Sequence, residues 1–193
     1  IVKFGKKIKT VNCSAYGASL VHVDAGLNPV APLYNYLKPF PSTLQEKLYN
    51  DYGGEETFSL GTSSPSLGSL NSGLQLYRLK MEQPALFEKI KYSLHLPQYI
   101  SSIFSRHPCS ELTSIGCHTA LWNFSKGNYH KWVTENNILS KLAPVQPSDQ
   151  LFNTKINDTD IHAGIGLHDS SAALIPYLHL TKEPFLLIST GTW

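Results

Sequence analysis

Charged residues are scarce in this sequence: they make up 16% of its 193 residues, against about a quarter in an average globular protein. The net charge is only +2, and the basic residues are scattered apart from Lys3, Lys6, Lys7 and Lys9. A hydrophobic content of 41% and an aromatic content of 11% argue against intrinsic disorder. Because no basic patch is present beyond the first residues, nucleic acid is excluded as the expected partner.

Cysteine is rare, and long apolar runs are missing. The three cysteines, Cys13, Cys109 and Cys117, are odd in number and too few for a disulfide framework, which is typical of a reducing compartment. No stretch has the length and apolar content of a membrane span, and no signal-peptide pattern is present. We therefore expect a soluble, cytoplasmic protein with no membrane partner.

The sequence also lacks the spacing of metal ligands. Cys109, Cys117 and His118, with His107 nearby, do not form the paired motifs that hold zinc. Buried small hydrophobic side chains and a surface histidine explain these residues better. The sequence therefore predicts no metal site formed by its own side chains.

The two ends are unlike those of a complete protein. The sequence begins at Ile1 without a methionine and stops at Trp193 inside a motif. We therefore expect it to be a fragment of a longer chain.

Short apolar runs alternate with segments of helical spacing along the chain. Apolar residues between positions 67 and 81 recur at intervals of three and four, which predicts a helix that ends before Pro84. Pro84 and Pro97 can each begin a further helix. The other predicted elements are strands at residues 9–14, 20–24, 160–163 and 185–188, and helices at residues 42–52, 129–141 and 169–178. This order predicts a mixed α/β fold.

The most informative segment is residues 164–173, which read Gly-Ile-Gly-Leu-His-Asp-Ser-Ser-Ala-Ala. A glycine-bearing turn here delivers one carboxylate, that of Asp169, to the start of a helix. An apolar run then leads to Ser-Thr-Gly-Thr-Trp at residues 189–193. Small residues leave backbone N–H groups open to phosphate, and a positioned carboxylate serves an acceptor hydroxyl. Both parts suit phosphoryl transfer.

These two segments resemble the Gly-x-His-Asp and Ser-x-Gly-Thr motifs of the FGGY carbohydrate kinases, including the rhamnulokinases and xylulokinases. The polar turn at residues 61–65, the helix after it, the Pro84 helix and residues 110–114 follow in the same order as in that family. Tyr16-Gly17-Ala18 is similar to the position where xylulokinases carry His-Gly and rhamnulokinases Trp-Gly. The resemblance covers nearly the whole chain.

The resemblance implies an actin-like ATPase (RNase H-like) domain, a mixed sheet flanked by helices, with a second domain only begun. Residues 1–180 would form the N-terminal, sugar-binding domain without its N-terminal hairpin. Residues 181–193 would be the first strand and phosphate turn of the C-terminal domain. The family's N-terminal Asp-x-Gly-Thr hairpin and C-terminal adenosine site have no counterpart in this sequence.

The implied function is an ATP-dependent carbohydrate kinase that uses Mg²⁺ and transfers the γ-phosphate of ATP to a hydroxyl of a ketose. The alternative is a non-catalytic sugar-binding or interaction module of actin-like fold, which the two missing family parts favour. A ketose and ATP are the expected partners, and a homodimer is left open.

Asp169 is the residue that the resemblance implies as general base, taking the proton of the attacking sugar hydroxyl. A helix N-terminus stabilises the anion of Asp169 and weakens it as a base, which a loose phosphoryl-transfer transition state tolerates. An Asp before a helix more commonly serves as an N-cap, and the two roles can coexist.

The resemblance places the sugar pocket at Tyr16 and Gly17, with His168 and Glu111 as further substrate contacts. Each side chain has a structural alternative. Tyr16 would then be a partly buried aromatic residue, His168 a packed neighbour that orients Asp169, and Glu111 a member of a local pair. The sequence leaves these alternatives open.

The end of the sequence supplies the implied phosphate contacts. Thr190, Gly191 and Thr192 would meet the donor phosphates of ATP through backbone N–H and hydroxyl groups. Ser-Thr-Gly-Thr alone is more often a hairpin turn. Its position one helix and one strand after Asp169 favours the phosphate role.

Overall fold

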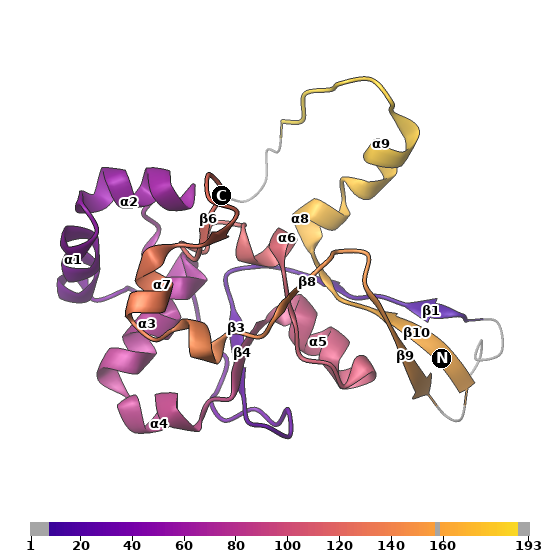
Figure 1. Ribbon diagram of the computed structural model, residues 1–193, viewed down its shortest axis with the longest axis horizontal. Coiled ribbons are helices and arrows are strands. Elements are labelled where there is room, and N and C mark those ends of the chain that lie inside the picture. Colours follow the sequence, from indigo (N-terminus) through magenta and orange to yellow (C-terminus); the bar gives the residue numbers. More distant parts are fainter. Residues whose placement is uncertain (1–7, 157–158, 189–193) are drawn as a thin grey trace.

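The computed structural model describes residues 8–156 and 159–188, which form an elongated molecule (Figure 1). Most helices gather at one end, and a three-stranded sheet projects at the other. A buried strand pair and the helices α5 (Leu96–Ser105) and α6 (Leu112–Ile115) lie between them. Within the described ranges, no helix is long and apolar enough to cross a membrane.

The projecting sheet joins segments from the two ends of the chain. β1 (Thr10–Val11) runs parallel to β10 (Thr159–Gly164), and β10 pairs antiparallel with β9 (Leu151–Ile156). Beyond a short break in each strand, β2 (Ser14–Ala15) runs parallel to β11 (Leu167–His168). The parallel pairing therefore extends from the projecting sheet toward the centre of the molecule.

One side chain, that of Asn12, bridges the breaks in the two strands. Asn12, between β1 and β2, accepts the N–H of Gly166, between β10 and β11, at an Oδ1–N distance of 2.9 Å. The backbone N–H of Leu167 then donates to the carbonyl of Cys13 at 2.9 Å. Since buried backbone N–H groups need partners, the asparagine replaces a ladder bond where the strands separate.

Other short strand pairs lie closer to the helical end of the described chain. β3 (Leu20–Val23) is buried at all four residues and pairs antiparallel with β4 (Tyr92–His95). The remaining pairs are β5 (Ser110–Glu111) parallel with β8 (Val145–Gln146), and β6 (Trp122–Asn123) antiparallel with β7 (Asn128–Tyr129).

Prolines mark the start of several helices. Pro84 begins α4, and Pro97 lies in the first turn of α5, because the first turn of a helix leaves its N–H groups unbonded and tolerates a residue without one. Both starts were predicted and are confirmed. The α-helices of the described residues are α1 (Ser42–Asp51), α2 (Gly54–Thr62), α3 (Ser72–Glu82), α4 (Pro84–Lys89), α5 (Leu96–Ser105), α6 (Leu112–Ile115), α7 (Lys131–Glu135), α8 (Asp169–Ala172) and α9 (Ile175–Leu180), with 3₁₀ turns at Gly68–Leu70 and Leu139–Lys141.

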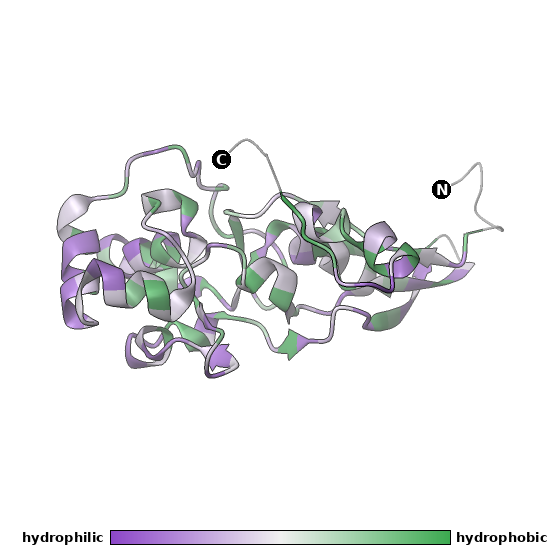
Figure 2. Cartoon of the chain, turned by 90° about the horizontal axis from the view of Figure 1, so that it is seen from above, coloured by the Kyte–Doolittle hydropathy of each residue, from purple (hydrophilic) through white to green (hydrophobic). Residues whose placement is uncertain are grey.

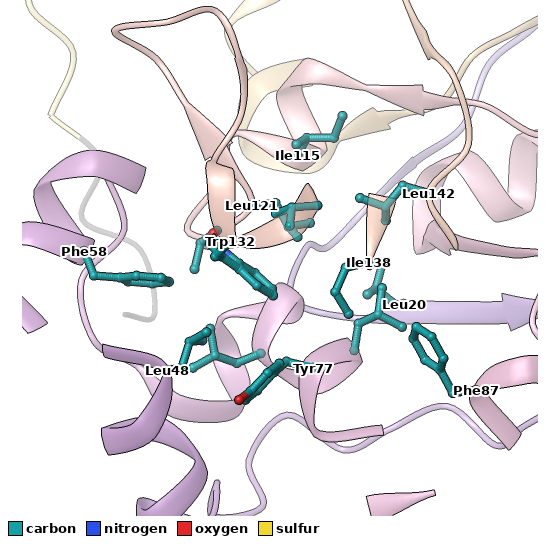
Figure 3. Packing of buried hydrophobic residues seen from close by; sticks show 14 of the residues in the cluster. Leu20, Leu48, Phe58, Tyr77, Phe87, Ile115, Leu121, Trp132, Ile138 and Leu142 are labelled. Carbon is teal, nitrogen blue, oxygen red and sulfur yellow. Dashed lines mark hydrogen bonds between the residues drawn. The ribbon is translucent and has the colours of Figure 1, made fainter. Parts of the chain in front are cut away.

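The main hydrophobic core lies among the helices around Trp132 (Figure 3). Trp132 is fully buried, and its Nε1 donates to the carbonyl of Ala120 at 2.6 Å. The ring of Tyr77 meets it edge-on, with 6.1 Å between ring centroids. Leu20 of β3 belongs to the same cluster. The loop just before β3, residues 16–19, is therefore anchored to the core.

Two predicted helices are shorter than expected. The helix predicted at residues 67–81 is α3, which starts later because Asn71 Oδ1 accepts the N–H of Leu67 and holds residues 67–71 in a turn. The helix predicted at residues 129–141 is reduced to α7 and a 3₁₀ turn. Asn137 has a φ of 55°, the left-handed conformation that commonly ends a helix.

The predicted elements after Asp169 also differ from the structure. The helix predicted at residues 169–178 is split into α8 and α9, because Pro176 has no N–H to donate to the carbonyl of Ala172. Residues 185–188 form no strand. A strand requires a neighbour to satisfy its backbone groups, and no described segment pairs with these residues.

Candidate active site

Two parallel strands end side by side and carry most of the candidate residues. In the pairing of β2 with β11, Ala15 lies opposite His168. Tyr16 and Gly17 follow the first strand, and Asp169 follows the second. Because parallel strands run in the same direction, the residues after them emerge at the same edge, where α/β proteins bind ligands. The structure thus brings together residues that are far apart in the sequence.

The turn that leads to Asp169 requires glycine. Gly166 has a φ of +87°, and a Cβ added to it would lie 2.3 Å from the carbonyl oxygen of Pro97 in α5. Both the backbone conformation and the contact with α5 exclude a side chain. Glycine therefore allows α5 to pack directly against the turn.

Four polar side chains from other parts of the chain are hydrogen-bonded to the backbone of this turn. Asn12 Oδ1 accepts the N–H of Gly166 at 2.9 Å, and the hydroxyl oxygen of Thr113 accepts the N–H of His168 at 3.1 Å. The amide of Gln98 donates to the carbonyl of Gly166 at 2.7 Å, and the hydroxyl of Ser101 donates to the carbonyl of Gly164. Such a network rigidifies the backbone that it satisfies. The direction in which Asp169 leaves β11 is therefore set by contacts from three different segments.

The side chain of Asp169 is half exposed, at 52%. Its Oδ1 accepts the N–H of Ser170 at 2.7 Å, whereas Oδ2 accepts no hydrogen bond from the described part of the chain. Asp169 is the first residue of α8, and the N-cap position belongs to His168, so Asp169 does not cap the helix. The carboxylate retains an oxygen that can meet a substrate hydroxyl.

His168 packs behind that carboxylate as a neutral ring. Burial lowers the pKa of His168 below its usual value; the charges of Asp169 and Glu111 oppose this effect, and His118 adds to it. Its Nε2 lies 3.5 Å from Asp169 Oδ1, which is not an ion pair while the imidazole is neutral. Nδ1 is buried and has no hydrogen-bond partner among the described residues.

The loop after β2 presents an aromatic surface at the same edge. A Cβ added to Gly17 would lie 2.9 Å from Cδ2 and from Nε2 of His168, so the loop backbone rests against that ring. Tyr16 is 40% exposed, and its ring centroid is 6.0 Å from that of Tyr36. Aromatic rings beside a few polar groups are typical of small-molecule sites.

Glu111 is fully buried rather than exposed at this edge. Its Oε2 accepts the N–H of Thr113 at 2.9 Å and also the hydroxyl of Thr113, and its Oε1 accepts the hydroxyl of Ser148 at 2.5 Å. Of the two roles considered for Glu111, local pairing is the one that the structure contains. An enclosed carboxylate has no surface to offer a sugar.

Two residues with strained backbones flank the edge, and the sequence carries no signal for them. Ala18 and His118 have φ values of 59° and 51°, a conformation that costs a residue other than glycine about 1–3 kcal/mol. The amides of Gln75 and Asn71, at the start of α3, donate to their carbonyls at 2.7 Å in each case. Such strain is common at functional sites.

Other predicted site residues are not placed by the structure. Thr190, Gly191 and Thr192 lie outside the described residues. In the described ranges, no group of three or more His, Cys, Asp or Glu side chains is arranged to hold a metal ion. A cavity of about 280 Å³ lies on the β9–β10 hairpin and includes none of the residues around Asp169; it is lined by Asn153, Thr154, Asp160, Ile161 and His162.

Comparison with solved structures identifies the fold. A carbohydrate kinase from Novosphingobium aromaticivorans matches 90% of this chain with a TM-score of 0.75 and 22% identity, over 39% of its own length. A ligand-bound xylulose kinase from Lactobacillus acidophilus matches 90% of the chain (TM-score 0.69, 14% identity, 38% of its length). A Plasmodium falciparum glycerol kinase with ADP matches 87% (TM-score 0.70, 14% identity, 35% of its length). No family model matches the sequence, and no curated protein matches it.

The chain therefore has the fold of carbohydrate kinases, a mixed α/β fold with helices and small sheets. This confirms the expected mixed α/β fold and the resemblance to carbohydrate kinases at the level of the fold. At these identities the likeness concerns the fold alone, and the chain spans less than two fifths of the length of each of these three structures.

Proposed function

We propose that this chain is the sugar-binding part of an ATP-dependent carbohydrate kinase of the FGGY family, which phosphorylates a hydroxyl of a ketose. The observation that carries the proposal is the half-exposed carboxylate of Asp169 at the end of β11, beside the aromatic loop that follows β2. The likeness of the fold to carbohydrate kinases supports it. In the proposal, the sugar packs against Tyr16 and turns one hydroxyl toward Asp169.

Asp169 has the role of general base in this proposal. The hydroxyl oxygen of the sugar attacks the γ-phosphorus, the bond to the β-phosphate oxygen breaks, and the hydroxyl proton passes to the carboxylate. In a loose transition state the acceptor hydroxyl must be oriented more than it must be strongly deprotonated. A carboxylate at the start of a helix, which is a weak base, is therefore sufficient. The neutral ring of His168 leaves this carboxylate without a competing ion pair.

The other parts of the proposed enzyme lie partly outside the described residues. Thr190, Gly191 and Thr192 would contact the phosphates of ATP, and Mg²⁺ would be bound mainly by those phosphates and by water, as is usual for this ion. The proposed domains remain residues 1–180, built on an RNase H-like sheet, and residues 181–193, the start of the second domain. A cytoplasmic location belongs to the same proposal, and a homodimer remains open.

The experiment is a kinase assay of the full-length protein on a panel of ketoses, with Asp169→Asn as the test variant. Loss of the base is expected to lower kcat by about 10²–10⁴-fold, while sugar binding measured by calorimetry changes little, because the amide keeps the shape of the carboxylate. Asp149→Asn, at an exposed loop position, is the matched control and should retain wild-type turnover.

Two outcomes would contradict this function. Undiminished turnover in Asp169→Asn would show that Asp169 is not the base. Sugar binding without any turnover or nucleotide binding in the wild-type protein would instead favour the non-catalytic sugar-binding module.

A further inference from the structure

A buried acid lies behind the turn of Asp169 and has no part in the proposed reaction. Glu111 has no exposed surface, and a carboxylate removed from water is costly unless donors satisfy it. Three donors do so: the N–H and the hydroxyl of Thr113, and the hydroxyl of Ser148. Glu111 is thus hydrogen-bonded to other parts of the fold, and its role must be other than contact with the substrate.

The fold assembles this pairing from two strands. Glu111 ends β5 and lies opposite Gln146 of β8 in a parallel pair, so β8 delivers Ser148, two residues further on, to the same carboxylate. Thr113 lies in α6, which begins immediately after Glu111. The carboxylate therefore ties β8 and α6 together at one point.

The direction of the hydrogen bonds gives Glu111 an influence on the turn. The hydroxyl of Thr113 donates its single hydrogen to Oε2 of Glu111. The lone pairs of that hydroxyl are left to accept the N–H of His168, at 3.1 Å. His168 is the residue before Asp169, and its side chain is buried. Glu111 thus fixes the hydroxyl orientation on which this N–H depends.

We propose that Glu111, acting through Thr113, is a positioning residue that fixes the direction of the Asp169 carboxylate for phosphoryl transfer. The proposal rests on the function assigned to Asp169, whereas the relay from Glu111 to the His168 N–H is a property of the fold. Small displacements of a reacting group are enough to lower turnover strongly.

The test uses full-length Thr113→Val, which deletes the hydroxyl and keeps the shape of the side chain. Thr154→Val is the matched control, because Thr154 is also half-buried and its hydroxyl bonds the carbonyl of Phe104, on the β9 side of the sheet. Thr113→Ser restores the hydroxyl. Hydrogen exchange of peptides covering residues 164–170 reports on the His168 N–H, and ketose kinetics report on Asp169.

Thr113→Val is expected to exchange the His168 N–H faster and to lose about 10–100-fold in kcat, with the KM for the ketose nearly unchanged. Thr113→Ser and Thr154→Val should stay close to the wild-type protein in both measurements. Glu111→Gln can keep its amide oxygen on Thr113 and turn its NH2 toward Ser148, so it should stay closer to the wild-type protein than Thr113→Val does. Glu111→Leu removes both acceptor oxygens and should resemble Thr113→Val in both measurements; a folded Glu111→Leu with wild-type kcat would contradict the role of Glu111.

The inference is overturned if the wild-type protein is active and Thr113→Val keeps its kcat, whatever its exchange rate. It is also overturned if the two valine variants lose kcat equally, since the effect would then be general destabilisation. A wild-type protein that turns over no ketose contradicts the proposed function itself, and the exchange measurement then separates that failure from an error in the relay.

Discussion

At the scale of single residues, Gly166 decides how the chain reaches Asp169. Its φ of +87° and its contact with the carbonyl of Pro97 both forbid a side chain. Gly166→Ala is therefore expected to lower the free energy of unfolding by about 2–5 kcal/mol, the sum of backbone strain and overpacking. Urea unfolding followed by circular dichroism measures this loss.

Gly54→Ala is the matched control for this substitution. Gly54 has a φ of +90°, and an added Cβ would meet nothing within 4 Å. It should lose only the strain, about 1–2 kcal/mol. If the two variants lost equal free energy of unfolding, the contact of α5 with the turn would not be what excludes a side chain at residue 166.

At the scale of elements, the β3–β4 pair and α3 enclose two histidines. Nδ1 of His22 lies 2.9 Å from Ser93 Oγ, and Nε2 of His95 lies 2.9 Å from Ser72 Oγ. Burial lowers the pKa of each to about 4, and His168 adds to the effect on His95. These imidazoles are neutral in the folded protein at neutral pH.

Acid should therefore destabilise the fold in a defined window. An unfolded histidine has a pKa near 6.5, so between about pH 6.5 and pH 4 the unfolded state binds more protons than the folded state. The free energy of unfolding should be at its full value above pH 6.5 and fall as the pH drops toward 4. The slope is at most about 1.4 kcal/mol per pH unit for each histidine. Urea unfolding across this range measures it.

Variants separate these histidines from other titrating groups. His22→Gln and His95→Gln should each reduce the slope, because each removes one proton-binding site of the unfolded state. His179→Gln, on the exposed surface of α9, should keep the wild-type slope. A stability that is flat from pH 6.5 to pH 4 in the wild-type protein would contradict the burial of neutral imidazoles.

At the scale of the whole molecule, the last described segment leaves the body of the protein with its apolar side chains exposed. Figure 1 shows it projecting beyond α8, and Figure 2 shows hydrophobic residues along it. Its exposed apolar residues include Ile175, Tyr177, Leu178, Leu180, Leu186 and Ile188. Exposed apolar side chains gathered on one segment favour association.

We expect the 193-residue chain to self-associate through this segment. Sedimentation velocity should show a weight-average mass that rises with concentration, and Leu180→Glu should reduce the rise because it places a charge in the contact. Leu60→Glu is the matched control: Leu60 is 74% exposed on α2 and Leu180 is 80% exposed. A mass independent of concentration, or equal effects of both variants, would contradict the expectation.

Several features of the fold could be predicted because their causes are local. Pro84 and Pro97 fit the first turn of a helix, whose N–H groups have no partner within the helix, and the glycine at residue 166 allows the turn there. β4 was not predicted, because a short strand is defined by its partner, and its partner β3 is distant in the sequence. β9 was not predicted either, although its hairpin partner β10 follows it directly. Residues 185–188 show the converse, since a strand-like run forms no strand without a partner.

The candidate site likewise has features that the sequence predicts and others that only the structure decides. The sequence by itself determined that a carboxylate, Asp169, follows a glycine turn and that Tyr16-Gly17 follows a strand, since both patterns are contained in a few adjacent residues. Only the tertiary structure decided that the two meet, because parallel pairing of β2 with β11 joins segments from opposite ends of the chain. It also decided that Glu111 is enclosed and bonded to Thr113 and Ser148, because burial depends on what packs around a side chain.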